Sequence, residues 1–123
     1  MESVFGPEMR ALDREVLAVV LLNTRLRLIK FEKLSQGTVN ETLAHPREIL
    51  KPAIIHSAYA FVLVHNHPSG DATPSDADRR LTRAASLAAT TMQIQLLDHL
   101  IMGAPAEADA RAGYFSFKEA DLL

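Results

Sequence analysis

The sequence contains no cysteine and no tryptophan among its 123 residues. The absence of cysteine excludes disulfide bonds and every metal site that is built on thiolates. An excess of one charge is also missing, because 13 basic and 15 acidic residues leave a formal net charge of −2. Such a balance provides no cationic field for nucleic acid or for an anionic membrane. We therefore expect neither direct nucleic-acid binding by this domain nor membrane association.

Long apolar runs are missing as well. The longest unbroken run, residues 16–22, is much shorter than the roughly 18 residues that a membrane span needs. The first residues lack the basic stretch and apolar core of a signal peptide, which predicts a cytoplasmic protein. The chain does have 48% hydrophobic residues over a length typical of one domain. We expect residues 1–123 to form a single domain around its own apolar core.

Several segments have the apolar content or the alternation of β-strands. They are residues 16–22, 26–34, 38–43, 59–64 and 94–102, with a short edge strand at 114–116. A tight turn joins the first two segments, so we expect them to form a hairpin. The alternation in the second strand of this hairpin, with a slip before Phe31, predicts that Leu26, Leu28 and Phe31 face inward.

Three segments are predicted to be helical. Residues 7–13 form a short one, and residues 46–58 a longer one that Pro52 should kink or split, at a cost of about 3 kcal/mol. The third spans residues 77–92 and has a continuous apolar face made of Ala77, Leu81, Ala84, Ala85, Ala88 and Met92. Helices interleaved with apolar strands predict the α/β class, with helices packed on the faces of a sheet.

The most informative segment follows the strand predicted at residues 59–64. It contains His65 and His67, and a turn-rich loop then leads to Asp78 in the first turn of the next helix. Because side chains alternate along a strand, both imidazoles lie on the same side of it. Two neutral imidazoles and one carboxylate form a ligand set suited to zinc, and catalytic zinc sites leave a fourth position for water. The spacing therefore predicts a zinc site at His65, His67 and Asp78.

Each of these residues also has an ordinary structural interpretation. Ser75 and Asp78 have the spacing of a capping box, although a carboxylate at the third helical position can cap a helix and also bind a metal. Without Asp78 and Glu15, the two histidines would be interpreted as simple strand-end residues. Asp71 is first of all a turn former in the loop. His99 is first of all a structural residue, and support of the site is the alternative for both.

The segment His65-Asn66-His67-Pro68-Ser69-Gly70-Asp71, with Pro74-Ser75 and the later Leu97-Asp98-His99-Leu100-Ile101, resembles the RadC family of bacterial proteins. That family carries a JAMM (also JAB or MPN-plus) metalloprotease-like domain. The resemblance covers residues 15–103 and 114–116, and it implies a mixed β-sheet flanked by helices, an architecture like that of cytidine deaminases. Longer family members begin with a helix-hairpin-helix region associated with DNA binding, for which we find no counterpart in this sequence.

The resemblance also implies roles for individual residues. His65, His67 and Asp78 would hold one zinc ion per chain. Glu15 would be the general base that takes a proton from zinc-bound water, and Ser75 would donate a hydrogen bond to the oxyanion or orient the water. The implied activity is hydrolysis of peptide or isopeptide bonds in a peptide or protein substrate whose identity the sequence does not give. Spacing alone leaves other acids open for the base role, namely Glu32, Glu41 and Glu48.

Three other functions compete with this interpretation. The runner-up is a DNA-repair-associated binding module that retains the fold without peptidase activity, but phosphate contacts need clustered Lys and Arg, and the net charge here is −2. A zinc nucleoside deaminase needs cysteine ligands that this chain lacks. A purely structural metal site is disfavoured because three ligands leave zinc open. The sequence gives no indication of the oligomeric state.

Overall fold

The computed structural model of the chain describes residues 16–35, 45–67, 69–103 and 113–123. Its elements, in chain order, are β1 (Leu17–Leu22), β2 (Leu28–Ser35), α2 (Pro46–Ile55), β3 (Ala60–Asn66), α3 (Asp76–Thr91), β4 (Gln95–Met102) and β5 (Tyr114–Ser116). The strands form one five-stranded sheet in the order β2-β1-β3-β4-β5. Strands β3 and β4 are parallel, and the other neighbouring pairs are antiparallel. The prediction of an α/β fold with a mixed sheet is confirmed.

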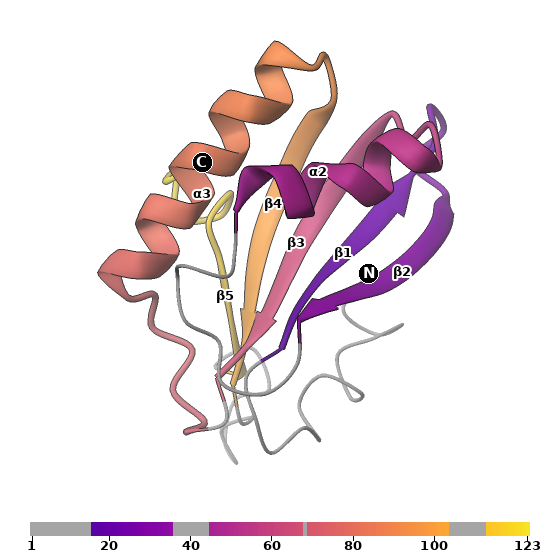
Figure 1. The fold of residues 1–123 in the computed structure, drawn as a ribbon. Coiled ribbons are helices and arrows are strands. Elements are labelled where there is room, and N and C mark those ends of the chain that lie inside the picture. The colour runs from indigo at the N-terminus through magenta and orange to yellow at the C-terminus, as the bar shows by residue number, and fades with distance from the viewer. Residues whose placement is uncertain (1–15, 36–44, 68, 104–112) are drawn as a thin grey trace.

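The two described helices lie over the same face of the sheet (Figure 1). Strands β1 and β3 are buried along their whole length, so their alternate residues contribute to a core on each face. The helix-side core joins Leu17, Val19, Leu21, Phe61 and Leu63 of the sheet to Ile49, Leu50, Ala53, Ala85 and Ala89 of the helices. No helix in the described part of the chain is long and apolar enough to cross a membrane.

The hairpin of β1 and β2 forms as predicted, but the prediction of its inward-facing residues was partly wrong. Leu26 and Leu28 are 55% and 52% exposed, whereas Phe31 packs against the core. Leu26 belongs to the turn, where it has a positive φ of 59° and donates its N–H to the carbonyl of Asn23. The register then shifts between Leu21 and Leu22. A single shift of this kind moves a strand's alternation to the opposite face, and the sequence indicated only that the alternation slips before Phe31.

The predictions for both long helices need correction. Helix α2 is not split at Pro52, whose carbonyl accepts the N–H of His56, and it ends at Ile55 instead of continuing to residue 58. Helix α3 spans nearly the predicted range, but Ala84 and Met92 of its expected apolar face are exposed. Its buried residues are Asp78, Thr82, Ala85 and Ala89. The face was misassigned because polar side chains take two of the buried positions. The helix predicted at residues 7–13 and the strand at 38–43 lie outside the described residues.

Candidate metal centre

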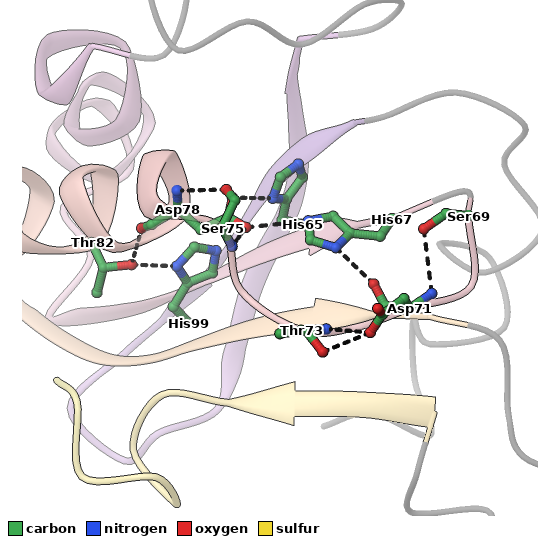
Figure 2. Close-up of polar contacts among 9 residues, drawn as sticks. All are labelled: His65, His67, Ser69, Asp71, Thr73, Ser75, Asp78, Thr82 and His99. Carbon is green, nitrogen blue, oxygen red and sulfur yellow. Dashed lines mark hydrogen bonds and ion pairs between the residues drawn. The ribbon is translucent and has the colours of Figure 1, made fainter.

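The three predicted ligands meet where β3 ends and α3 begins, at the lower end of the sheet in Figure 1. His65 is in β3, His67 directly follows that strand, and Asp78 lies in the first turn of α3. One nitrogen of each imidazole and a carboxylate oxygen all lie within 4.8 Å of one another. Figure 2 draws the two short contacts: Asp78 Oδ1 lies 3.2 Å from His65 Nδ1, and Asp78 Oδ2 lies 3.2 Å from His67 Nε2.

A capping box fixes the position of the Asp78 carboxylate. The backbone N–H of Asp78 donates to Ser75 Oγ at 3.1 Å, and the backbone N–H of Ser75 donates to Asp78 Oδ2 at 2.8 Å. The capping interpretation of this pair is therefore confirmed, and the cap turns the carboxylate toward the histidines. The Ser75 Oγ accepts in this cap and keeps its own proton for another acceptor.

The neighbouring loop fixes the orientation of the His67 ring. His67 Nδ1 lies 2.9 Å from the backbone carbonyl oxygen of Asp71, and a carbonyl can only accept, so Nδ1 carries the proton that it donates. The opposite nitrogen, Nε2, then faces the Asp78 carboxylate at 3.2 Å. A nitrogen lone pair and an anionic oxygen at this distance repel each other unless a proton or a metal cation lies between them. A hydrogen bond behind a ligating histidine is the usual arrangement in metal sites.

The donor set also fits zinc in its dimensions. In a tetrahedral site with zinc–ligand distances of about 2.0–2.1 Å, neighbouring ligand atoms are separated by about 3.3 Å. Each histidine nitrogen lies 3.2 Å from one carboxylate oxygen of Asp78, His65 from Oδ1 and His67 from Oδ2, and one oxygen with the two nitrogens fits within 4.8 Å. Burial would raise the pKa of the Asp78 carboxyl, but the facing rings of His65 and His67 and the hydrogen bond from the Ser75 backbone outweigh it and lower the pKa below its usual range. The carboxylate is thus ionised at neutral pH, and the group of three could hold a metal ion.

Asp71 supports the cluster through its backbone instead of its carboxylate. Its Oδ1 accepts from the hydroxyl of Thr73 at 2.7 Å and from the Thr73 N–H at 3.0 Å, which lowers the pKa of the Asp71 carboxyl. These bonds shape the loop so that the Asp71 carbonyl meets the ring of His67 (Figure 2). The sequence indicated the residue but not which of its groups makes the contact.

The same loop packs directly on the end of β4. The N–H of His67 donates to the carbonyl of Met102 at 2.8 Å. A Cβ atom at Gly103 would lie only 2.4 Å from the carbonyl oxygen of Gly70, so this approach requires glycine. Gly70 itself has a φ of 91°, a conformation that other residues rarely adopt. These contacts hold the loop between the second histidine and the helix against the sheet.

Asn66, between the two histidines, is a buried residue that the sequence analysis missed. Its side-chain oxygen accepts the backbone N–H of Val16 at 2.6 Å. Alternation points this side chain opposite to its neighbours, and β1 pairs with β3 so that Leu17 lies opposite His65. The start of β1 is thereby attached to the end of β3 that carries the histidines. Glu15, which precedes Val16 in sequence, lies outside the described residues.

Two of the alternative bases, Glu32 and Glu48, do not join the cluster. Glu32 lies near Lys30 and His56, at 3.3 and 4.0 Å, and Glu48 lies 3.5 Å from Arg47. Neither belongs to the group of possible metal ligands found among the described residues. Glu41, like Glu15, falls outside those residues.

His99 lies behind the cluster, on the side of the sheet that faces α3. In β4, Leu96 pairs with Phe61 and Asp98 pairs with Val62, so Leu97 is an extra residue, a β-bulge that breaks the alternation. His99 is fully buried, and its Nδ1 lies 2.6 Å from the hydroxyl of Thr82. Burial, with a smaller contribution from His65, lowers the pKa of His99 to about 3. The sequence analysis did not identify Thr82.

The lowered pKa of His99 predicts how the metal-free protein responds to acid. The unfolded chain takes up this proton below pH 6.5, but the folded chain does not until about pH 3, so stability falls as the pH decreases between these values. Between about pH 7 and about pH 5, the lowered pKa of His99 should decrease the free energy of unfolding by about 2 kcal/mol. Urea unfolding should show this loss in wild type and a smaller one in His99→Gln. His65 and Asp78, which also influence His99, are present in both proteins; equal losses would contradict the prediction.

An apolar groove lies apart from the candidate centre, between α2 and α3. Its volume is about 800 Å³, and its walls include Leu50, Ile54, Leu87 and Met92. None of the histidines or carboxylates of the candidate centre lines it. The groove therefore does not coincide with the candidate centre, which is identified by its metal-ligating side chains.

Comparison with known proteins agrees with the resemblance noted from the motifs. A family model described as RadC-like JAB domain matches residues 1–122. A UPF0758 protein of Pelodictyon phaeoclathratiforme is 49% identical over 110 residues, which are 89% of this chain and 46% of the relative. Those of Symbiobacterium thermophilum and Actinobacillus pleuropneumoniae serotype 5b are 45% and 41% identical over 118 and 115 residues, covering 96% and 94% of this chain. The alignments span 47% and 49% of those relatives, so this chain corresponds to about half their length. The chain belongs to the RadC-like JAB domain family.

Proposed function

We propose that this chain is a zinc-dependent hydrolase of peptide or isopeptide bonds. The observation that carries the proposal is the arrangement of His65, His67 and Asp78, whose facing nitrogens and carboxylate oxygens have the separation of zinc ligands. Membership of the JAB domain family supports it, because that family is compatible with this chemistry. When bound, zinc supplies Lewis acidity and lowers the pKa of water to about 7.

The protein side chains then have separate tasks. His65, His67 and Asp78 would hold the metal through the facing atoms described above. Glu15 would accept the proton of the attacking water and pass it to the leaving amine. Ser75 is exposed, and its hydroxyl proton is not used by the capping box, so it is available to donate to a developing oxyanion. Val16, which follows Glu15 in the sequence, is attached to Asn66 by a backbone hydrogen bond.

The Glu15→Gln variant tests the assignment of the base. We expect zinc content to be unchanged and hydrolysis to fall by at least about 100-fold, because general acid–base catalysis contributes roughly 10²–10⁴ in rate. The probe is a defined mixture of short synthetic peptides and isopeptide-linked lysine peptides, with cleavage followed by mass spectrometry with and without a chelator. Glu48→Gln, at an acid of α2 that lies outside the cluster, is the matched control.

Two results would contradict this proposal. Undiminished cleavage by Glu15→Gln would remove Glu15 from the base role. Zinc-loaded wild type that cleaves none of the peptides would favour a binding module that retains the fold and the metal. In that event a DNA-binding measurement at increasing salt becomes informative, because contacts with phosphates weaken steeply as salt rises.

A further inference from the structure

A buried polar pair, Thr82 and His99, lies behind the candidate centre, and the proposed chemistry does not use it. Thr82 is on the buried face of α3 and His99 is in β4; their side chains are 1% and 0% exposed. Burying two polar side chains is costly unless both are hydrogen-bonded. The hydroxyl of Thr82 contacts both His99 Nδ1, at 2.6 Å, and the backbone carbonyl oxygen of Asp78, at 2.8 Å.

The direction of these bonds follows from counting protons. A threonine hydroxyl has one proton, and the carbonyl of Asp78 can only accept it. Both contacts can therefore be hydrogen bonds only if His99 Nδ1 carries a proton and donates it to Thr82 Oγ1. His99 is then the Nδ1–H tautomer. Its Nε2 is an unprotonated nitrogen that is buried and finds no hydrogen-bond partner within the described residues.

This pair connects the sheet to two of the candidate ligands. Through the Thr82 hydroxyl, His99 is linked to the backbone of Asp78. The ring of His99 also stacks with the ring of His65, with centroids 6.3 Å apart and planes at 26°. His99 also stacks on Phe117, with centroids 4.7 Å apart and planes at 6°. The His99 ring thus lies between two stacking partners in the sequence of contacts, adjacent to the ring of one candidate ligand and linked to the backbone of another through Thr82.

The C-terminal turn holds this stack in place. The carboxylate of Asp98 accepts from the hydroxyl of Ser116 at 2.7 Å and from the N–H of Lys118 at 3.0 Å. The N–H of Phe117 donates to the carbonyl of His99 at 3.1 Å. These bonds join β4 to the residues on either side of Phe117. The ring that supports His99 therefore has a fixed position of its own.

We propose that Thr82 and His99 are positioning residues of the metal centre, which together fix the spacing between the Asp78 carboxylate and the ring of His65. The inference rests on the proposed metal binding and specifies what in the fold determines its affinity. Groups that orient metal ligands from behind typically change metal affinity by roughly 10–100-fold when removed. His99 is not itself a ligand in this arrangement, because stacked rings present their faces, whereas a nitrogen binds a metal in the plane of its ring.

The helix contains internal controls for the threonine. Thr90 and Thr91 donate to the carbonyls four residues earlier, Ser86 and Leu87, at 3.0 and 3.1 Å, as Thr82 does to Asp78. Both are exposed, far along the helix from the metal ligands. If Thr82 contributed only to helix stability, replacing Thr90 or Thr91 would have a similar effect. If Thr82 contributes to the metal centre, only its replacement should weaken metal binding.

The test compares Thr82→Val, which removes the hydroxyl, with Thr82→Ser, which keeps it, and with Thr90→Val. Zinc affinity is measured by competition with a chromogenic chelator, and the coordination geometry is monitored by the visible absorption of bound Co²⁺. We expect Thr82→Val to bind zinc roughly 10–100-fold more weakly, with an altered Co²⁺ spectrum. Thr82→Ser should remain within about threefold of wild type, and Thr90→Val should be unchanged. Equal affinity and identical spectra for Thr82→Val and wild type would refute the positioning role and leave zinc binding intact.

A second measurement needs neither a metal nor a variant. Nitrogen-15 NMR of the histidine rings in the metal-free wild-type protein distinguishes the two tautomers, and we expect His99 as Nδ1–H. An Nε2–H tautomer would overturn the inference even if Thr82→Val failed to fold. Wild type that shows the expected tautomer but binds no zinc would refute the proposed function, and the positioning role with it. The two failures are therefore distinguishable.

Discussion

Zinc binding is expected to be lost in Asp78→Ala, with an affinity roughly 100- to 1,000-fold below that of wild type. Structural zinc sites with four ligands have apparent binding energies of about 10–16 kcal/mol, so one ligand accounts for about 3–4 kcal/mol. The Asp78 carboxylate is also the ligand that contacts both histidines, at 3.2 Å each. Elemental analysis after dialysis against a weak chelator should find about one zinc per wild-type chain and almost none in the variant.

The matched control for this loss is Asp78→Asn. Asparagine keeps an oxygen that can accept the Ser75 N–H, so the capping box survives, whereas alanine removes it at a cost of about 1 kcal/mol. Asp78→Asn should therefore unfold at nearly the wild-type temperature without metal and still fail to retain zinc. Wild-type zinc content in both variants would exclude Asp78 as a ligand.

Zinc is also expected to raise the thermal unfolding midpoint of the wild-type protein by about 16 °C. A ligand that binds only the folded state at about 1,000 times its dissociation constant adds about 4 kcal/mol, and each kcal/mol shifts the midpoint by about 4 °C for a domain of this size. The cluster joins the end of β3 to the start of α3, so a bound metal would cross-link two elements of the core. Calorimetry with and without zinc measures the shift.

A variant distinguishes stabilisation by zinc at the predicted cluster from stabilisation by zinc bound elsewhere. The chain has other histidines, among them His45 and His56, which flank α2. Binding at those positions would stabilise Asp78→Asn as much as wild type. A shift in wild type that disappears in Asp78→Asn would place the stabilising metal at the predicted cluster, and equal shifts would contradict that location.

Much of the candidate site could be predicted because its geometry is local. The alternation of a strand places His65 and His67 on one side, and the spacing of a capping box places Asp78 in the first turn of the helix. The buried strands β1 and β3 followed from their uninterrupted apolar residues. In each case the relevant contacts lie within one element or between neighbours in sequence.

The residues that sequence analysis missed act over long separations. Asn66 binds Val16 across 50 positions, and Thr82 meets His99 across 17. His99 faces the helices only because a bulge at Leu97 breaks the alternation of β4. Asp78 and Thr82 occupy buried positions of α3 where apolar side chains are usual. The apolar residues of the helix therefore did not indicate which of its faces is buried. A functional site in this fold interrupts the hydrophobic pattern from which the core would otherwise be predicted.

The most direct test of the central claim is anomalous diffraction at the zinc absorption edge, from crystals of the wild-type protein grown with zinc. We expect one strong peak about 2.0–2.2 Å from a nitrogen of His65, a nitrogen of His67 and a carboxylate oxygen of Asp78. A peak at other residues, or no peak at the end of β3 in zinc-saturated crystals, would contradict the claim.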